Sequence, residues 1–283
     1  MNRQDFEHLK GKTCAITGGA GVLGTSICES LAKAGINLGI IDRNHEKAQQ
    51  MAKDLSSRYL IKAVGVAGNV LDRESLETAR IEILKQIGEI DFLINGAGGN
   101  SPTATTKVEQ IIPSEKFAWE DTFYGLEEEG FKQVFDLNFT GTLLPSMVFT
   151  RPMVERGYGV VINISSMNAF KPLTKIPAYS AAKSAINNFT EWLAVHLGKT
   201  GVRVNAVAPG FFLTNQNRFL LTDEKSGGLT PRGQRIIAST PMGKFGEPDS
   251  LGGTILYLLS DLSSFVTGVV IPVDGGYSAF GGV

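Results

Sequence analysis

The chain has 283 residues and a nearly balanced charge, with 27 Lys and Arg residues against 28 Asp and Glu residues. Hydrophobic residues make up 42% of the chain and charged residues 19%, which is typical of a chain that can bury a sizeable core. This composition argues against long disordered tails and against a basic surface for the phosphates of nucleic acids. We therefore expect no nucleic-acid partner.

The cysteines and the hydropathy pattern bear on redox chemistry and location. Cys14 and Cys28 show no CxxC or metal-ligand spacing, so we expect small buried residues and no disulfide scaffold. Residues 1–12 lack the apolar core of a signal peptide, and no stretch approaches the roughly 18 apolar residues of a membrane span. We expect a soluble, cytoplasmic protein that has no membrane partner.

Short apolar runs alternate with amphipathic segments along the whole chain. A strand is expected at 14–17, followed by a helix whose apolar stripe contains Leu23, Ile27 and Leu31 and which ends at Gly35. Further strands are expected at 36–41, 61–66, 90–94, 160–164, 202–207 and 269–273, and further helices at 44–55, 73–87 and near 131–156, 179–198 and 249–260. This alternation predicts an α/β fold, a doubly wound, mainly parallel seven-stranded sheet with helices on both faces.

No composition shift or Pro/Ser-rich linker divides the chain, so we expect residues 1–283 to form a single domain. Two connections, near 99–130 and 210–241, are longer than ordinary loops, and such segments in a compact domain are usually functional or mobile. Both follow expected strand ends, beyond which ligands bind in an open α/β sheet. We expect both to form loops around a substrate.

A glycine-rich turn joins the first strand to the first helix. Gly18, Gly21 and Gly24 lie in the run TGGAGVLG, where glycines let the backbone approach a pyrophosphate at the free N–H groups of the helix start. Taken alone, this turn is also compatible with a tight connection that binds nothing. Its place between a strand and a helix, with Asp42 ending the second strand, favours a Rossmann-type dinucleotide site.

The residues after the second strand indicate which dinucleotide binds. Asp42 can accept hydrogen bonds from ribose hydroxyls, and its charge would repel a 2′-phosphate, so NAD is favoured over NADP. Arg43 could compensate such a phosphate or could be a solvated loop cation. The runs 68–70 and 95–98 follow the next two strands and could outline the groove or serve only as turns.

Three residues predict proton-transfer chemistry. Tyr179 and Lys183 are four residues apart at the start of an expected helix, so their side chains share a face. Ser166 follows a strand thirteen residues before the tyrosine. A phenol has a pKa near 10, which a nearby ammonium would lower. We expect Ser166 to hold a substrate oxygen while Tyr179 exchanges its proton.

Over essentially its whole length the chain resembles the short-chain dehydrogenases/reductases. Besides the residues above, the matching positions include Asn138, Pro209, Gly210, Thr214 and the run 274–276. The resemblance implies that Tyr179 is the general acid/base and that Lys183 lowers its pKa and contacts the nicotinamide ribose. It also implies that Ser166 orients the substrate and that Asn138 supports a proton-relay water.

The same resemblance implies a set of cofactor contacts. They are Gly18, Gly21, Val22, Leu23, Gly24, Asp42, Arg43, Asn69, Val70, Asn95, Ala97, Gly98, Tyr179, Lys183, Pro209, Gly210, Phe212 and Thr214, the last touching the nicotinamide carboxamide. The family usually has Asp where this chain has Asn69. The interval from Gly98 to Asn138 is also longer than in many members, and we expect it to shape the substrate entrance.

Three runs resemble one branch of the family, the D-mannonate oxidoreductases or fructuronate reductases. They are SMNAFKPLTK from Ser166, PGFFLTNQNR from Pro209 and VDGGYSAF from Val273. The implied reaction is hydride transfer between NAD(H) and the D-fructuronate/D-mannonate pair. The family resemblance also implies pairing into a homotetramer through the apolar helix after Tyr179, which could equally be an ordinary buried helix.

A sugar-acid substrate would need a cation for its carboxylate. Lys171, Lys175 and Arg218 are candidates, and each could instead be a solvated surface cation. Arg218 is favoured because a guanidinium can bind a carboxylate through two parallel hydrogen bonds. Asn100 and Asn168 could bind the sugar hydroxyls.

Other functions stay open at this stage. The chain could reduce a 3-oxoacyl carrier or a neutral sugar, or it could sense NAD without turnover. A sensor has no need of the Ser166, Tyr179 and Lys183 trio, so an enzyme is favoured. The three histidines show no ligand spacing, and we expect no metal site.

Overall fold

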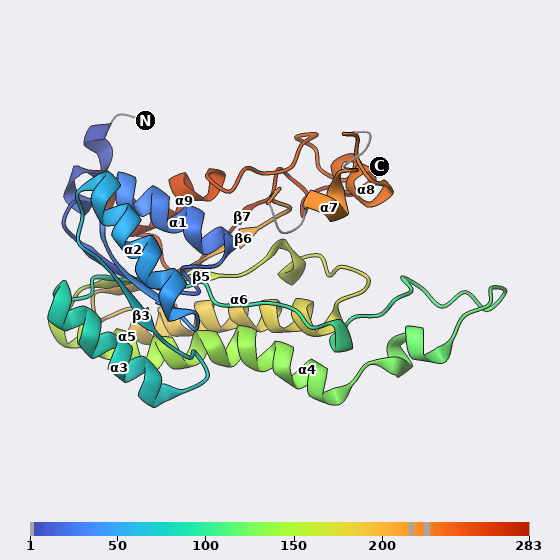
Figure 1. The fold of residues 1–283 in the computed structure, drawn as a ribbon, viewed down its shortest axis with the longest axis horizontal. Coiled ribbons are helices and arrows are strands. Elements are labelled where there is room, and N and C mark those ends of the chain that lie inside the picture. Colours follow the sequence, from blue (N-terminus) through green and yellow to red (C-terminus); the bar gives the residue numbers. More distant parts are fainter. Residues whose placement is uncertain (1–2, 215–217, 224–226, 283) are drawn as a thin grey trace.

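The computed structural model describes residues 3–214, 218–223 and 227–282. Its centre is a sheet of seven strands, all parallel, in the order β3-β2-β1-β4-β5-β6-β7 (Figure 1). The strands are β1 (Thr13–Thr17), β2 (Asn37–Asp42), β3 (Ala63–Ala67), β4 (Phe92–Asn95), β5 (Gly159–Ile164), β6 (Val202–Pro209) and β7 (Val270–Val273). The strand order reverses between β1 and β4, as at the switch point of a doubly wound sheet. The predicted α/β fold is confirmed.

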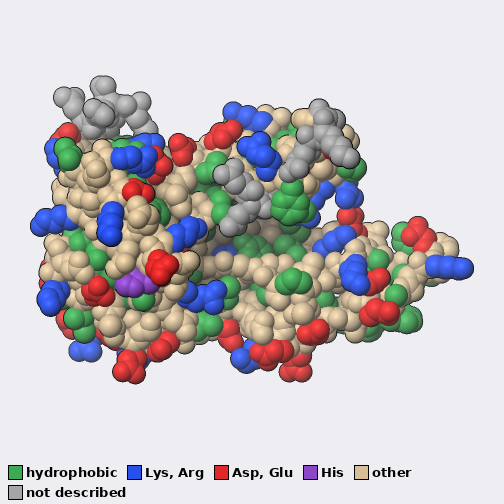
Figure 2. Space-filling model, in the orientation of Figure 1, with side chains coloured by type: hydrophobic (Ala, Val, Ile, Leu, Met, Phe, Trp, Pro, Cys, Tyr) green, Lys and Arg blue, Asp and Glu red, His purple; other side chains and the backbone are tan. Residues whose placement is uncertain are grey.

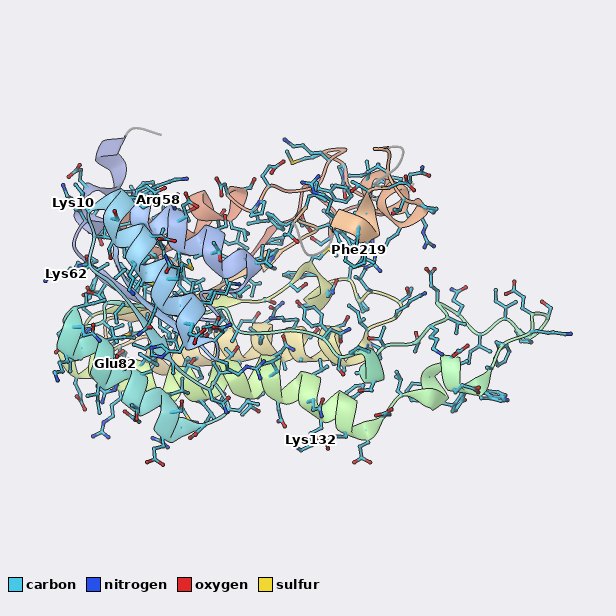
Figure 3. The ribbon with its side chains drawn as sticks, viewed as in Figure 1. Lys10, Arg58, Lys62, Glu82, Lys132 and Phe219 are labelled. Atoms are coloured by element: carbon cyan, nitrogen blue, oxygen red, sulfur yellow. The ribbon has the colours of Figure 1, made fainter. Side chains whose placement is uncertain are left out.

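Helices cover both faces of this sheet (Figure 1). They are α1 (Val22–Lys33), α2 (His45–Tyr59), α3 (Arg73–Gln86), α4 (Glu128–Phe135), α5 (Gly141–Arg156), α6 (Pro177–Leu197), α7 (Arg218–Leu221), α8 (Pro231–Ala238) and α9 (Ser250–Leu259). One apolar cluster joins the sheet to α1, α2 and α9, and the other joins it to α3, α5 and α6. Charged side chains such as Arg58, Glu82 and Lys132 project outward from the helices (Figure 3).

The strands are apolar on both faces because the sheet lies between these two layers. In β1, Cys14 and Ile16 belong to one cluster and Ala15 to the other, as the period-two alternation of a strand requires. Cys14 and Cys28 are free and fully buried, as expected for small core residues. Burial raises the pKa of both thiols, which keeps them protonated and unreactive.

The helix expected near 131–156 is divided. It consists of α4, one π-helical turn (Asp136–Thr140) and α5. Apolar periodicity does not reveal the extra residue of a π turn, because the pattern resumes on the other side. The turn contains Asn138, so the irregularity lies at a residue expected in the site.

Residues 99–127 form an arm that projects from the body of the molecule (Figure 1). Its two limbs are tied where Lys107 N and Val108 N donate to Asp121 O at 2.9 and 3.2 Å. The limb on either side of Asp121 carries a cluster of aromatic rings in edge-to-face contact, formed by Phe117, Trp119, Phe123 and Tyr124. Only the base of the arm, where Thr106 N donates to Lys175 O at 3.0 Å, meets the segment that leads into α6.

The arm also contacts the second long segment, because Glu109 forms an ion pair with Arg235 of α8 at 3.1 Å. That the first long segment shapes the substrate entrance stays a prediction. No helix in the described ranges is both long and apolar enough to cross a membrane.

Candidate active site

The turn between β1 and α1 depends on glycine at two positions. Gly18 adopts φ +64°, and a Cβ on it would lie 2.8 Å from the Ala97 Cα. A Cβ on Gly24 would lie 2.3 Å from the Gly18 carbonyl oxygen. The helix is capped by Gly21, which has no side chain to bond the first N–H groups. The turn therefore presents backbone donors at a helix N-terminus, an arrangement suited to a phosphate.

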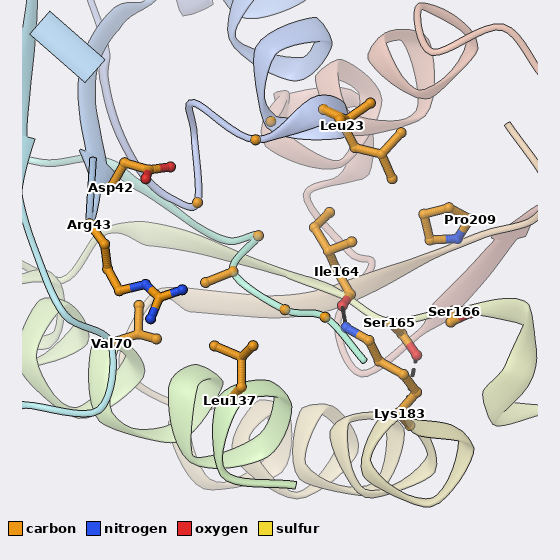
Figure 4. A pocket seen from close by; sticks show the side chains of 18 of the residues that line it. Leu23, Asp42, Arg43, Val70, Leu137, Ile164, Ser165, Ser166, Lys183 and Pro209 are labelled. Carbon is orange, nitrogen blue, oxygen red and sulfur yellow. Dashed lines mark hydrogen bonds between the residues drawn. The ribbon is translucent and has the colours of Figure 1, made fainter. Parts of the chain in front are cut away.

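A single cleft of about 460 Å³ runs along the carboxyl edge of the sheet from this turn (Figure 4). Its lining consists of Gly18, Gly21, Val22, Leu23, Gly24, Asp42, Arg43, Gly68, Asn69, Val70, Leu71, Gly96, Ala97, Gly98, Gly99, Leu137, Ile164, Ser165, Ser166, Tyr179, Lys183, Pro209 and Gly210. The surface is hollowed between the segment that carries α7 and helix α6 (Figure 2). Phe219 projects from α7 on the side that faces α6 (Figure 3).

One end of the cleft holds Asp42 and Arg43 (Figure 4). Asp42 is half-buried at the end of β2, and its Oδ1 accepts a hydrogen bond from Asn44 N at 3.0 Å. Arg43 is exposed beside it. The carboxylate and the guanidinium thus both line the place expected for the adenosine ribose.

The other end brings together the three residues expected to transfer protons. Ser166 follows β5, while Tyr179 and Lys183 lie on the first turns of α6. Lys183 is 3% exposed, its Nζ donates to the Ile164 carbonyl oxygen at 2.8 Å (Figure 4), and it lies 5.5 Å from the centre of the Tyr179 ring. The Ser166 Oγ accepts the Asn168 N–H at 3.2 Å.

Burial shifts two pKa values in this trio. It lowers the pKa of Lys183 to about 7 and raises the pKa of Tyr179, against which a hydrogen bond with Ser166 acts. In the protein without ligands the desolvation of the phenol is the largest influence on its pKa, and the effect of Lys183 on that pKa stays a prediction. At neutral pH the phenol is protonated and can donate to a substrate oxygen.

Asn138 anchors the cleft wall from the π turn. It is fully buried, and its Nδ2 donates to the carbonyl oxygens of Val134 and Gly99, each at 2.7 Å. Its Oδ1 accepts the Gly99 N–H at 3.3 Å. A Cβ on Gly98 would lie 2.7 Å from that Oδ1 and 3.3 Å from the Lys183 Nζ. Glycine at position 98 is therefore what lets the loop pass between the asparagine and the lysine.

Three expected cofactor residues lie outside the cleft lining. Asn95 is buried below it, where its Nδ2 donates to Ser146 Oγ at 3.0 Å and to Asn163 Oδ1 at 2.8 Å. This bonding holds the carboxyl ends of β4 and β5 together, so the Asn95 side chain supports the cleft floor. Phe212 is buried, and Thr214 accepts a hydrogen bond from Arg218 N at 2.9 Å through its carbonyl oxygen.

The two candidate lysines for a substrate carboxylate are bonded to backbone oxygens. Lys171 Nζ donates to Phe280 O and Lys175 Nζ donates to Lys107 O, each at 2.6 Å. These bonds join the segment before α6 to the C-terminal segment and to the arm. Arg218 is exposed at the first residue of α7.

The two candidate asparagines for sugar hydroxyls differ in burial. Asn100 Nδ2 donates to Thr105 Oγ1 at 2.9 Å within the arm. Asn168 is 4% exposed, and its Oδ1 has no hydrogen-bond partner within the described part of the chain. A buried amide oxygen without a partner is costly, so a donor group of a ligand would stabilise it.

Sequence reasoning missed several lining residues that act through their backbone or their apolar surface. Ile164 contributes the carbonyl oxygen that Lys183 contacts. Every residue has such a carbonyl group, so residue type could not single it out. Leu137 lies in the π turn, which the apolar pattern did not reveal. Ser165 directly precedes the expected Ser166 and had a readable signal, a second hydroxyl at the strand end. Within the described ranges no group of three His, Cys, Asp or Glu residues gathers to hold a metal ion.

Comparison with known proteins agrees with this geometry. The family model described as short chain dehydrogenase matches residues 12–225. An uncharacterised oxidoreductase of Bacillus subtilis, UxuB, is 49% identical over 98% of each chain. A 3-oxoacyl-[acyl-carrier-protein] reductase of Aquifex aeolicus is 33% identical over 95% of this chain and 98% of its own length.

Among solved structures, one from Haemophilus influenzae that is described provisionally as a D-mannonate oxidoreductase, with bound NAD, superimposes with a TM-score of 0.89. It is 47% identical, and the match covers 97% of this chain and 98% of that one. The family model spans most of the chain, and the cleft carries the glycine turn and the Ser, Tyr and Lys trio that the family resemblance implied. The chain belongs to the short-chain dehydrogenase family of oxidoreductases.

Proposed function

We propose that the protein is an NAD(H)-dependent oxidoreductase of sugar acids that interconverts D-fructuronate and D-mannonate. The observation that carries the proposal is the continuity of the cleft, which joins the Gly18–Gly24 turn and Asp42 to Ser166, Tyr179 and Lys183. A dinucleotide that spans this cleft would have its adenosine at one end and its reactive ring beside the tyrosine. A sensor of NAD would not need the buried proton-transfer groups at the second end.

The residues present fit a dinucleotide. Side chains at Gly18 and Gly24 would fill the backbone cradle, and Asp42 offers carboxylate oxygens to ribose hydroxyls. When bound, the nicotinamide would supply or accept the hydride. In the reduction, Tyr179 donates its phenolic proton to the substrate oxygen, Ser166 orients that oxygen, and Lys183 contacts the ribose. Asn138 holds the wall and supports a water in the proton relay.

The choice of sugar acid over acyl carrier follows the degree of similarity. The oxidoreductase described provisionally as acting on D-mannonate is 47% identical to this chain, against 33% for the 3-oxoacyl reductase. Asn168 stays a candidate for a polyol hydroxyl by its residue type, since its amide oxygen has no partner among the described residues, but it lies outside the lining of the cleft.

The decisive experiment compares initial rates across substrates and cofactors. We expect NADH-dependent reduction of D-fructuronate and NAD-dependent oxidation of D-mannonate, with much lower kcat/KM for a 3-oxoacyl thioester and for neutral ketoses. Preference for the thioester or for a neutral sugar would replace the substrate assignment. Tight NADH binding without turnover of any of these compounds would favour a sensor.

Cofactor preference is tested at Asp42. We expect the unmodified protein to prefer NADH to NADPH. Asp42→Ala should narrow this preference for NADH, because the variant loses the carboxylate that would bond the ribose hydroxyls and would repel a 2′-phosphate. Arg43→Ala should leave the NADH rate nearly unchanged. An unmodified protein that is equally active with NADPH would show that the positive charge of Arg43 outweighs the repulsion between Asp42 and a 2′-phosphate.

We further propose that Arg218 binds the substrate carboxylate. Its guanidinium is exposed at the start of α7, whereas Lys171 and Lys175 already bond backbone oxygens. Arg218→Ala should raise KM for D-fructuronate by roughly 10-fold or more, the loss expected for a charge-assisted bond, and change the reduction of a neutral ketose little. Arg232→Ala, an exposed arginine on α8, is the matched control. Equal effects on acid and ketose would contradict the role.

We also propose that the protein is a homotetramer that pairs through α5 and α6. The support is the exposure of large apolar side chains on these helices, with Met147 at 49%, Trp192 at 57% and Val195 at 85%. Exposed apolar surface of this kind marks protein interfaces.

A further inference from the structure

Three consecutive residues at the end of β5 each contact α6. The Ile164 carbonyl oxygen accepts from Lys183 Nζ at 2.8 Å, and Ser166 lies near enough to Tyr179 for its side chain to act against the rise in the pKa of the phenol. Between them, Ser165 Oγ lies 2.5 Å from Asn187 Oδ1. The three helix residues are spaced i, i+4 and i+8, so they lie along one face of α6. Two of these pairs belong to the proton-transfer machinery and the third does not.

The Ser165 hydroxyl has one hydrogen to donate, and Asn187 receives it. The alternative acceptor, the Lys183 carbonyl oxygen, is 3.4 Å away (Figure 4), which is longer than an ordinary O–H···O bond. Ser165 N also donates to Val207 O at 2.8 Å. The residue is therefore held by β6 through its backbone and by α6 through its side chain.

We propose that Asn187 is a positioning residue: by accepting the Ser165 hydroxyl it fixes the end of β5 against α6, and so sets Ser166 and the Ile164 carbonyl at working distance from Tyr179 and Lys183. Asn187 lies one helical turn beyond Lys183 and outside the lining of the cleft, and its side chain contacts Ser165, which does line the cleft.

The geometry explains why one such bond matters for turnover. Lys183 is buried, and among the described residues its ammonium group donates to the Ile164 carbonyl oxygen. A shift of β5 against α6 lengthens that bond and moves Ser166 relative to Tyr179 at the same time. A misplacement of about 1 Å in an active site can cost roughly 100-fold in rate.

A double-mutant cycle tests the proposal. The cycle rests on the proposed function only in its choice of D-fructuronate as substrate. Ser165→Ala removes the donor, Asn187→Leu removes the acceptor at similar size, and Asn188→Leu is the exposed control on the same helix. Each single change should lower kcat for D-fructuronate by roughly 10-fold or more, with the Kd for NADH within about 2-fold of the wild type. The double variant should be no worse than either single variant, because one shared bond is lost.

Two results would overturn it. The first is a kcat within about 2-fold of the wild type in a folded Ser165→Ala or Asn187→Leu protein, whatever the loss in Tm. The second is additive effects in the double variant, which would mean that the two residues act separately. Should Asn187→Leu fail to fold, Ser165→Ala decides the first comparison alone.

A second readout needs no substrate and so separates this proposal from the proposed function. Lys183 can be titrated by NMR in protein labelled with [ε-¹³C]lysine, its signal assigned by its loss in Lys183→Met. Tyr179 is the titratable group that the structure places beside it. Ser165→Ala should move the Lys183 midpoint by about half a pH unit or more, since its hydrogen-bond acceptor moves, and Asn188→Leu should not. An unmoved midpoint contradicts the proposal even in a protein that reduces no sugar acid.

Discussion

Lys183 is buried and Tyr179 is half-buried, and desolvation moves their pKa values in opposite directions because the neutral form of each is favoured. The pKa of the phenol rises, and the pKa of the ammonium falls to about 7. A protonated tyrosine is the form that a reductase needs, since the substrate oxygen gains a proton as it gains a hydride. Of the two groups, the lysine is the one whose pKa lies near neutral pH.

Removal of the phenolic hydroxyl tests the proton-transfer role. Tyr179→Phe keeps the ring that contacts Lys183 and should cut turnover by roughly 10²–10⁴-fold, the usual contribution of a positioned general acid/base. NADH binding, measured by fluorescence titration, should stay nearly unchanged. Tyr257→Phe on α9 is the control. Activity retained in Tyr179→Phe would remove the tyrosine from the reaction.

The lowered pKa of Lys183 predicts how stability depends on pH. Burial lowers the pKa from 10.5 to about 7, so between these values the unfolded protein binds a proton that the folded protein does not. The free energy of unfolding of the wild type, relative to Lys183→Met, should therefore rise as the pH increases from about 7 towards 10.5. Below pH 7 the difference in free energy of unfolding between the two proteins should be constant, because Lys183 is then protonated in both the folded and the unfolded state and its buried charge destabilises the folded one. Urea unfolding of both proteins without cofactor at pH 6, 8 and 10 measures this, and a flat or falling difference would refute it.

At the scale of the element, the path of the loop after β4 depends on the absence of a side chain at Gly98. Gly98 passes beside Asn138 and Lys183, where a Cβ would lie 2.7 Å from the amide oxygen and 3.3 Å from the ammonium. The neighbouring Gly99 differs, since its Cβ would make an ordinary contact of 3.4 Å with the Leu137 side chain. The two glycines therefore form a matched pair.

Alanine at each position should have different results. Gly98→Ala should lower the free energy of unfolding by roughly 1–3 kcal/mol, as overpacking does, and should lower kcat because Asn138 or Lys183 must move. Gly99→Ala should change both little. Thermal unfolding and steady-state rates measure the pair, and equal behaviour of the two variants would show that the loop can relax away from the lysine.

The sequence could predict the sheet, because apolar strands and amphipathic helices alternate in a regular pattern. It could also predict most of the cleft, because the glycine turn and the Tyr179–Lys183 spacing depend on residue type. The π turn around Asn138 and the carbonyl of Ile164 depend on backbone geometry, which residue type does not record. The pKa of Tyr179 also depends on burial by distant segments, which residue type does not record, so the rise caused by desolvation could not be anticipated.

At the scale of the whole molecule, large apolar side chains are exposed on the arm and on the outer faces of α5 and α6. The described arm carries exposed aromatic rings, and α5 and α6 expose Met147, Trp192 and Val195. Trp192 stacks on His196, with ring centres 4.8 Å apart, so its ring is held in one orientation on the outer face of α6. A fixed, exposed aromatic ring costs little side-chain entropy on association, which suits it to an interface.

The homotetramer predicted from the family resemblance is tested on this face. Val195→Glu places a charge on the most exposed of these apolar positions, and we expect it to shift the wild-type tetramer to dimers or monomers in sedimentation velocity at micromolar concentration, because an unpaired charge cannot be buried between subunits. Ile81→Glu, an exposed apolar position on α3, should leave the assembly intact. Circular dichroism should show both variants folded, since both side chains face solvent in a single chain. A wild-type protein that sediments as a monomer, or a Val195→Glu protein that remains tetrameric, would place any interface elsewhere than α6.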